Sequence, residues 1–248
     1  MPRFLCLPGY LQSGRVFAEK SSGLRKMLTK KLGYELEYID PPILIHKKES
    51  LPFQLGADET ESEQRWNDLV SKNVNRCWWD YHDGIYEHFQ EAYDYLVDYI
   101  RKNGPYDGIL GFSQGAAMAA IMANTIASHE GLAEFKVAVL FSGFAFTISS
   151  SDAKTDEESV DDFAARSSLN KSYEKYYKRG KSDTTFVSIY GKEDAVVPPA
   201  RSQYLNRLYG NAVNVFTHDG GHFVPNKKDV LQPIVDVIWG AIELKPFL

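Results

Sequence analysis

The chain has 248 residues, a net charge of -5 and 44% hydrophobic residues, which suits one globular domain with a sizeable core. The acidic balance and the lack of a Lys/Arg cluster argue against a nucleic-acid partner. No apolar run reaches the length of a membrane span, and Phe4–Leu7 is too short for the core of a signal peptide. The two cysteines, Cys6 and Cys77, do not make a disulfide framework. We therefore expect a soluble cytoplasmic protein.

Segments typical of buried strands alternate with segments of helical periodicity along the chain. We expect strands at Arg3–Leu7, Glu35–Ile39, Gly108–Leu110, Phe135–Phe141, Thr185–Tyr190 and Asn211–Thr217. We expect helices at Val16–Leu32, Tyr86–Lys102, directly after Ser113, Val160–Lys178, Pro199–Leu208 and Pro225–Leu244, the last kinked or broken at Pro233. Strands that alternate with helices imply right-handed parallel crossovers. The sequence therefore predicts an α/β fold, with a mostly parallel sheet of about six strands and helices on both faces.

We expect residues 1–248 to form a single domain with two excursions from this alternation. The first, at about 43–83, is too long for a simple connection and holds several large aromatics: Trp66, Trp78, Trp79 and Tyr81. The second, at about 147–183, begins with a polar and acidic stretch at 149–162, which we interpret as a mobile loop whose negative charges form a solvated face and not a metal site.

The sequence Gly111-Phe112-Ser113-Gln114-Gly115 directly follows a predicted strand and precedes a helix rich in alanine. In this Gly-x-Ser-x-Gly pattern a sharp turn holds the serine in a strained conformation, with its hydroxyl exposed above a parallel sheet. A Cβ atom at position 111 or 115 would crowd the turn or the neighbouring strand. The pattern also arises by chance, but its place between a strand and a small-residue helix predicts that Ser113 is a nucleophile.

A serine nucleophile requires a base, and the base requires an acid that orients it. On this type of sheet they follow in the chain order serine, acid, histidine, each in a loop after a strand. Asp194 follows the strand predicted at 185–190, and His222 follows the strand predicted at 211–217. Glu193 competes with Asp194, because a one-residue difference in the loop would exchange them; we prefer Asp194.

Six histidines compete for the role of base. Four of them lie in the first excursion or on and near helices, which is typical of structural or solvated histidines: His46, His82, His88 and His129. His218 and His222 are four residues apart, a spacing that on a helix suggests a zinc pair. Gly220-Gly221 between them argues against a helix, so the sequence predicts His222 as the base, with no metal and no cofactor.

An oxyanion hole needs two backbone donors near the serine. The N–H of Gln114 supplies one, because it follows the nucleophile at the start of a helix. The second is expected from the loop after the first strand, where Gly9 allows a close approach of the backbone. Tyr10 is the preferred donor and Leu11 the alternative. The competing interpretation of this loop is a simple glycine turn.

Five blocks of sequence, spread almost from end to end, carry a resemblance to a known family: Leu7–Gly14, Lys20–Lys26, Asn103–Gly108, Gly111–Ala117 and Gly220–Asn226. Together they resemble the fungal FSH family of serine hydrolases, within the α/β-hydrolase fold. The resemblance implies intracellular ester hydrolysis with Ser113, Asp194 and His222 as the catalytic triad. Pro8 stands where the family usually has histidine. Because proline has no N–H and a fixed φ, the rim of the oxyanion loop differs here.

The activity that we expect is that of a serine carboxylesterase, which cleaves small-molecule esters with apolar acyl chains through an acyl-enzyme. Trp78 and Trp79, with Leu11, would form a wall for the acyl chain, although buried aromatics are usually core. No Arg cluster suggests an anionic substrate, so we expect neutral esters. The alternatives are an acyl-thioesterase, a lysophospholipase-type lipid hydrolase or a non-catalytic ligand-binding module. The oligomeric state stays open.

Overall fold

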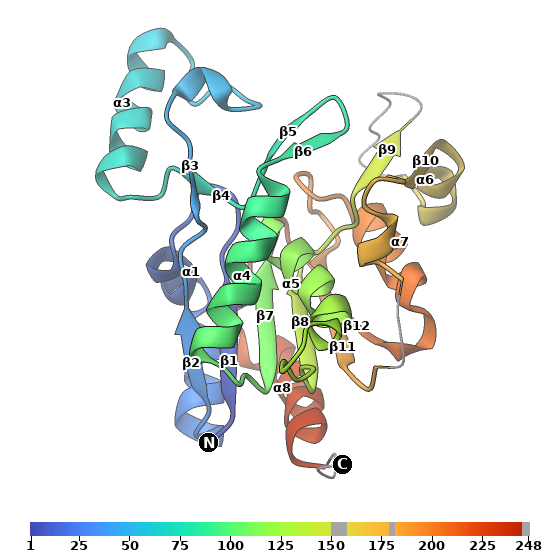
Figure 1. The fold of residues 1–248 in the computed structure, drawn as a ribbon. Helices are drawn as coiled ribbons and strands as arrows, with labels where there is room; N and C mark the ends of the chain where they lie inside the picture. The colour runs from blue at the N-terminus through green and yellow to red at the C-terminus, as the bar shows by residue number, and fades with distance from the viewer. Residues whose placement is uncertain (150–157, 179–181, 245–248) are drawn as a thin grey trace.

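Six strands form one parallel sheet at the centre of the molecule (Figure 1). The computed structural model describes residues 1–149, 158–178 and 182–244. In spatial order the strands are β12 (Val213–His218), β11 (Thr185–Gly191), β8 (Val137–Phe141), β7 (Gly108–Phe112), β1 (Arg3–Leu7) and β2 (Glu35–Tyr38). Every neighbouring pair in this order is parallel. The prediction of a parallel sheet of about six strands is confirmed.

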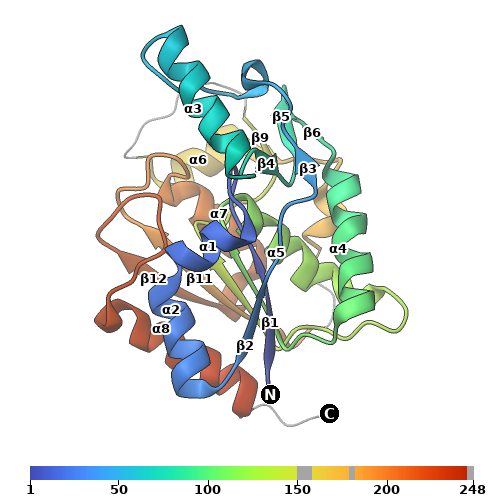
Figure 2. The same ribbon diagram turned by 90° about the vertical axis from the view of Figure 1, so that its left-hand side faces the viewer.

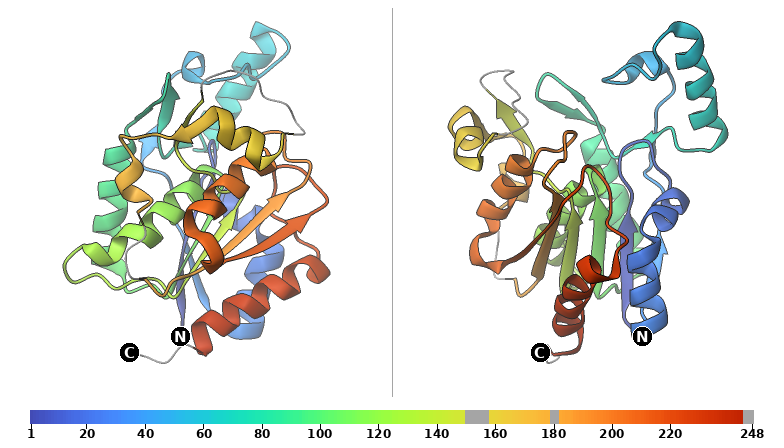
Figure 3. Two further views of the ribbon diagram at one scale, coloured as in Figure 1. Left: turned by 90° about the vertical axis from the view of Figure 1, so that its right-hand side faces the viewer. Right: turned by 180° about the vertical axis from the view of Figure 1, so that it is seen from behind.

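Helices cover both faces of this sheet (Figures 2 and 3). One face carries α4 (Phe89–Asn103), α5 (Gln114–Thr125) and α7 (Pro199–Tyr209); the other carries α1 (Gly14–Lys20), α2 (Ser22–Lys26) and α8 (Lys228–Glu243). Successive side chains of a strand point to opposite faces. In β1, Leu5 and Leu7 therefore join the core under α4 and α5, whereas Phe4 and Cys6 join the core under α2 and α8.

The helix predicted at Val16–Leu32 is not continuous, and the prediction is wrong in this respect. The segment divides into α1, α2 and a π-helical turn at Met27–Lys31. The first break lies at Ser21, whose hydroxyl donates to the Phe17 carbonyl at 2.7 Å and lies 2.9 Å from the Tyr38 hydroxyl. A serine that bonds the backbone in this way competes with regular helix geometry.

The helix predicted at Tyr86–Lys102 begins instead at Phe89. Tyr86 belongs to a hairpin of β5 (Asp80–His82) and β6 (Ile85–Glu87), and its ring stacks on Phe146 at a centroid distance of 3.8 Å. Tyr86 fits the apolar pattern of the predicted helix, but its ring is buried because it packs against another segment. The helix itself does not extend to Tyr86.

The helix predicted at Val160–Lys178 is also wrong beyond its first two turns. Only α6 (Val160–Arg166) is helical, and the next residues form β10 (Ser167–Leu169), antiparallel to β9 (Thr147–Ser149). A 3₁₀ turn follows at Glu174–Tyr176. Most of the acidic stretch expected at 149–162 falls on residues 150–157, which lie outside the described residues.

The closing helix begins at Lys228, so Pro225 does not occupy its first position. Pro233 lies inside this helix, which continues through it to Glu243. The remaining elements are β3 (Ile43–Leu44), a 3₁₀ turn at Lys48–Ser50, α3 (Glu59–Ser71), β4 (Arg76–Cys77), and 3₁₀ turns at Ile126–Ser128 and Gly210–Ala212. Within the described ranges, no helix is both long enough and apolar enough to cross a membrane.

Gly115 brings α5 against the end of β1, and this contact can be tested. A Cβ atom there would lie 2.1 Å from the Leu7 carbonyl oxygen and 2.4 Å from that of Pro8. Gly115→Ala should therefore lower the free energy of unfolding by about 1–3 kcal/mol, the usual cost of overpacking. Gly240→Ala is the matched control, because its Cβ meets nothing closer than 4.0 Å and it lies inside α8.

The control should raise stability by up to about 1 kcal/mol, since alanine favours a helix more than glycine does. Urea unfolding midpoints of the two variants would be compared with the wild type. Equal midpoints for Gly115→Ala and Gly240→Ala would contradict the close approach.

Candidate active site

Ser113 occupies a strained turn between β7 and α5. Its φ of 55° and ψ of -119° are unfavourable for any residue with a side chain. Backbone hydrogen bonds fix the turn on both sides: the Ser113 N–H donates to the Phe141 carbonyl at 2.9 Å, and the Ser113 carbonyl accepts from Ala116 at 2.9 Å and Ala117 at 3.0 Å. The turn is the elbow that the sequence predicts.

Two glycines make the elbow possible. A Cβ atom on Gly111 would lie 2.2 Å from the Gly115 carbonyl oxygen, so the turn has no room for a larger residue. A Cβ atom on Gly9 would lie 3.0 Å from the Phe112 ring and 3.3 Å from the Ser113 Cβ. The loop after β1 therefore passes directly against the elbow.

Asp194 and His222 lie in the loops after β11 and β12 and bind each other. The distance between His222 Nδ1 and Asp194 Oδ2 is 2.8 Å. The other carboxylate oxygen, Oδ1, accepts from the N–H groups of Val196 at 3.0 Å and Val197 at 2.8 Å. The Asp194 side chain is fully enclosed, whereas Glu193, the competing acid, is exposed.

The environment keeps Asp194 charged. Burial would raise the pKa of this carboxyl, but the hydrogen bond and charge of His222, with hydrogen bonds from Val197 and Ser142, hold the pKa below its usual value. A lowered pKa stabilises the fold above the pKa of the unfolded chain, and this contribution is lost as the pH falls through the folded-state pKa. At neutral pH a carboxylate here can stabilise a protonated imidazole.

The imidazole of His222 packs against the elbow. Its ring lies 4.7 Å from the ring of Phe112, the residue before Ser113. The two loops that carry the acid and the base are also in close contact, because a Cβ atom on Gly191 would lie 2.0 Å from the Gly220 carbonyl oxygen. Three segments far apart in the sequence thus meet at one end of the sheet.

Ser142 is a site residue that the sequence analysis did not consider. It follows β8, has a φ of 50° and is 1% exposed. Its hydroxyl donates to Asp194 Oδ2 at 2.8 Å, the oxygen that also binds His222. The available signal was its position, since it directly follows a strand that lies between the elbow strand and the strand of the acid.

Two of the expected oxyanion donors have no acceptor among the described residues: the backbone N–H groups of Tyr10 and Gln114. Leu11, the alternative to Tyr10, has a φ of 54° and already donates its N–H to the Arg76 carbonyl at 2.9 Å. Tyr10 and Gln114 are therefore free to donate to a ligand, and Leu11 is not.

Comparison with known proteins decides the family. A family model described as "Serine hydrolase (FSH1)" matches residues 1–234. The chain belongs to this family. "Family of serine hydrolases 3" from Saccharomyces cerevisiae is 30% identical over 243 residues, which cover 96% of this chain and 84% of that protein. "Esterase OVCA2" from Danio rerio is 28% identical over 256 residues, which cover 95% and 96% of the two chains.

The fold has counterparts among solved structures. The crystal structure of Arabidopsis thaliana SOBER1 matches with a TM-score of 0.59 at 15% identity, covering 98% of this chain and 99% of that one. The α/β-hydrolase fold expected from the sequence is thus confirmed, as is the resemblance to the FSH family. This member of the FSH1 family is an enzyme, a serine hydrolase.

In this FSH1-family chain Trp78 and Trp79 are held on the elbow. The side-chain amide of Gln114 accepts from the Trp78 N–H at 3.0 Å and donates to the Trp79 carbonyl at 3.1 Å. The Trp78 indole donates to the Pro8 carbonyl at 2.8 Å. The two side chains are 0% and 2% exposed, so in this structure both rings belong to the core. Their expected contact with an acyl chain stays a prediction.

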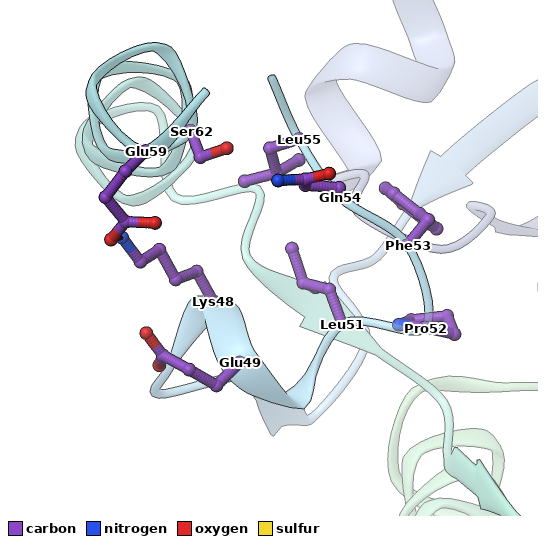
Figure 4. Close-up of a pocket in the computed structure, with 9 residues that line it drawn as sticks. All are labelled: Lys48, Glu49, Leu51, Pro52, Phe53, Gln54, Leu55, Glu59 and Ser62. Atoms are coloured by element: carbon purple, nitrogen blue, oxygen red, sulfur yellow. Dashed lines mark hydrogen bonds and ion pairs between the residues drawn. The ribbon is translucent and has the colours of Figure 1, made fainter. Parts of the chain in front are cut away.

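A pocket of about 380 Å³ opens elsewhere, in the first excursion of this hydrolase (Figure 4). Its lining residues all lie between positions 48 and 62, and none of them is Ser113, Asp194 or His222. One of them, Phe53, contacts the ring of Tyr10 at a centroid distance of 6.3 Å. Lys48, its one basic lining residue, already pairs with Glu59 and Glu63. Among the described residues, no group of three or more His, Cys, Asp or Glu side chains could hold a metal ion.

The stability of Trp79→Ala tests whether the Trp79 indole belongs to the core. Because Trp79 is enclosed and packs on Tyr86, Phe144 and Phe146, the substitution should lower the free energy of unfolding by about 3–5 kcal/mol. Tyr81→Ala is the control, since Tyr81 is a large aromatic of the same segment that is 48% exposed; it should cost under about 1 kcal/mol. Chemical unfolding measures both, and unchanged stability of Trp79→Ala would contradict the core role.

Proposed function

We propose that this hydrolase cleaves carboxylic esters through an acyl-enzyme, with Ser113 as nucleophile, His222 as base and Asp194 as the acid that orients the base. The observation that carries the proposal is the hydrogen bond between His222 and Asp194, with the imidazole packed on the elbow that presents Ser113. The ester chemistry is supported by relatives named as esterases, among them the Danio rerio protein and "Esterase C25G4.2" from Caenorhabditis elegans.

The reaction follows from the groups at this end of the sheet. The Ser113 hydroxyl attacks the ester carbonyl while His222 Nε2 takes its proton, and the charged Asp194 stabilises the imidazolium. The N–H groups of Tyr10 and Gln114 donate to the oxyanion of the tetrahedral intermediate. His222 then gives the proton to the leaving alcohol, and the acyl group remains on Ser113. Water, deprotonated by His222, attacks the acyl-enzyme. His222 returns this proton to the Ser113 oxygen as the bond from that oxygen to the acyl group breaks, and the carboxylic acid leaves.

Ser142 is the competing serine, and its geometry favours a positioning role. Its hydroxyl donates to Asp194 itself, whereas a nucleophile must reach the imidazole nitrogen that faces away from the acid. Ser113, in contrast, precedes α5, a twelve-residue helix whose N-terminus favours negative charge. We therefore assign the nucleophile to Ser113 and the orientation of the carboxylate to Ser142.

Apolar side chains near the acid and the base support a preference for apolar acyl chains. Val196 lies two residues after Asp194 and is 65% exposed, and Phe223 directly follows His222 and is 51% exposed. Both side chains are open to solvent, whereas an acyl chain could contact the indoles of Trp78 and Trp79 only after a rearrangement of the core.

The assignment of the two serines can be tested with matched alanine variants. Ser113→Ala should lose fluorophosphonate labelling and lower kcat/KM by about a thousandfold or more. Ser142→Ala should still be labelled and lose about tenfold in kcat/KM, the effect of one hydrogen bond to a charged group. Circular dichroism would check the fold of both variants. Normal labelling of Ser113→Ala, or loss of labelling in Ser142→Ala alone, would overturn the assignment.

The acyl preference can be measured with p-nitrophenyl esters of increasing chain length. Each buried CH₂ group contributes about 0.8 kcal/mol, so kcat/KM should rise up to about fourfold per carbon until the chain leaves the apolar surface. Phe223→Ser should flatten this rise, because it removes the exposed ring that follows the base in the chain, and Trp239→Ser, which changes an exposed ring of α8, should leave it intact. A kcat/KM independent of chain length in the wild type would refute the preference.

A further inference from the structure

A guanidinium without a counter-charge lies close to the acid of the site. Arg201 is the third residue of α7, the helix that begins five residues after Asp194. Its Cζ atom sits 4.2 Å above the centre of the Phe144 ring. In the part of the chain that the structure describes, Arg201 forms no ion pair, and its guanidinium makes no hydrogen bond. The other arginine of this helix, Arg207, pairs with Asp161 at 2.8 Å.

The charged and titratable groups around Arg201 come from several elements: Tyr81, Tyr86, Tyr177 and Asp194. Burial raises the pKa of Tyr86 and that of Tyr177, so both phenols are neutral. Asp194 is the one carboxylate in this set, and its oxygens are already bound by His222, Ser142 and two backbone N–H groups. The guanidinium therefore keeps its positive charge without a partner in direct contact.

The surroundings of Arg201 make its unpaired positive charge still less favourable. Burial lowers the pKa of its guanidinium, because removal from water disfavours the charged form. The first turn of α7 contains no acidic residue, and the positive end of a helix repels a cation. Arg201 as a residue is nevertheless only partly buried, so its side chain keeps some contact with solvent.

We propose that Arg201 binds a carboxylate of the substrate, so that the preferred ester combines an apolar chain with one negative charge. A guanidinium is a planar fork that donates two parallel hydrogen bonds to a carboxylate, and such a pair is favoured where solvent is partly excluded. The inference rests on the proposed ester hydrolysis. This anionic ester replaces the neutral ester expected from the sequence. In the sequence, a single arginine among Pro199, Ala200 and Ser202 does not indicate an anion site.

The first test compares two esters that differ in whether one carboxylate is free or methylated. The probes are p-nitrophenyl hydrogen glutarate, which carries a carboxylate, and its methyl ester, which does not. The wild type should cleave the anionic ester with a kcat/KM about tenfold higher or more, and Arg201→Met should bring this ratio near one. Arg201→Lys should retain part of the preference. Arg207→Met, on the same helix, is the control that should keep the wild-type ratio.

A second pair of probes places the charge on the alcohol side: 4-acetoxybenzoate and phenyl acetate. An Arg201-dependent preference for the anion in either pair supports the proposal and shows on which side of the ester the carboxylate lies. A wild type that shows no preference in either pair would overturn it. A preference that persists in Arg201→Met would overturn it as well.

A binding measurement separates this inference from the proposed chemistry. Ser113→Ala would be titrated calorimetrically with monomethyl glutarate, an anion, and with dimethyl glutarate. The anion should bind more tightly, and the added Arg201→Met change should remove the difference. If the wild type cleaves no ester but this difference is found, the proposed function fails and the anion site stands. If esters are cleaved but no difference is found, the anion site fails alone.

Discussion

The enclosed carboxylate of Asp194 connects the loops at the carboxyl end of the sheet. One oxygen binds the turn that starts α7, through Val196 and Val197. The other binds Ser142, after β8, and His222, after β12. An unpaired charge in the interior would be strongly unfavourable, and these donors together stabilise the carboxylate. They thereby help to fix the position of the imidazole.

The strained turn at Ser113 is the second constraint, and it explains much of what the sequence could predict. A sharp turn between a strand and a closely packed helix tolerates only small residues, and Gly111 and Gly115 meet this requirement visibly in the sequence. The order of strands and loops then places Asp194 and His222 after successive strands of one sheet. Parallel strands bring their carboxyl ends to the same edge, so sequence order alone predicted that these two residues would meet.

The parts that the sequence did not predict depend on contacts between distant segments. The charges of Val160–Lys178, with acids early and Lys/Arg late, resembled those of one helix, but the chain forms α6 and then pairs β10 with β9. Tyr86 resembled the first residue of a helix because an aromatic residue there fits the helical pattern. Its ring in fact stacks on Phe146, sixty residues later. Short apolar runs fit either a helix or a strand, and tertiary packing decides between them.

Contacts between distant segments also determine the parts of the site that the sequence did not predict. Ser142 has no motif around it, and its role appears only when β8 and β11 lie side by side. Arg201 resembled an ordinary helix residue, and only the surrounding aromatic rings and the occupied oxygens of Asp194 show that its charge is unpaired. From the sequence, the indoles of Trp78 and Trp79 could line a pocket or belong to the core. Both are buried, so in this structure they belong to the core.

We propose that the elbow serine, and not the serine bound to the carboxylate, forms the acyl-enzyme. The most direct measurement is tandem mass spectrometry of the wild-type protein after reaction with a fluorophosphonate and proteolysis. We expect one adduct, on the peptide that contains Ser113, with the modified residue identified by fragmentation. An adduct on Ser142, or on any other residue with Ser113 unmodified, would contradict it.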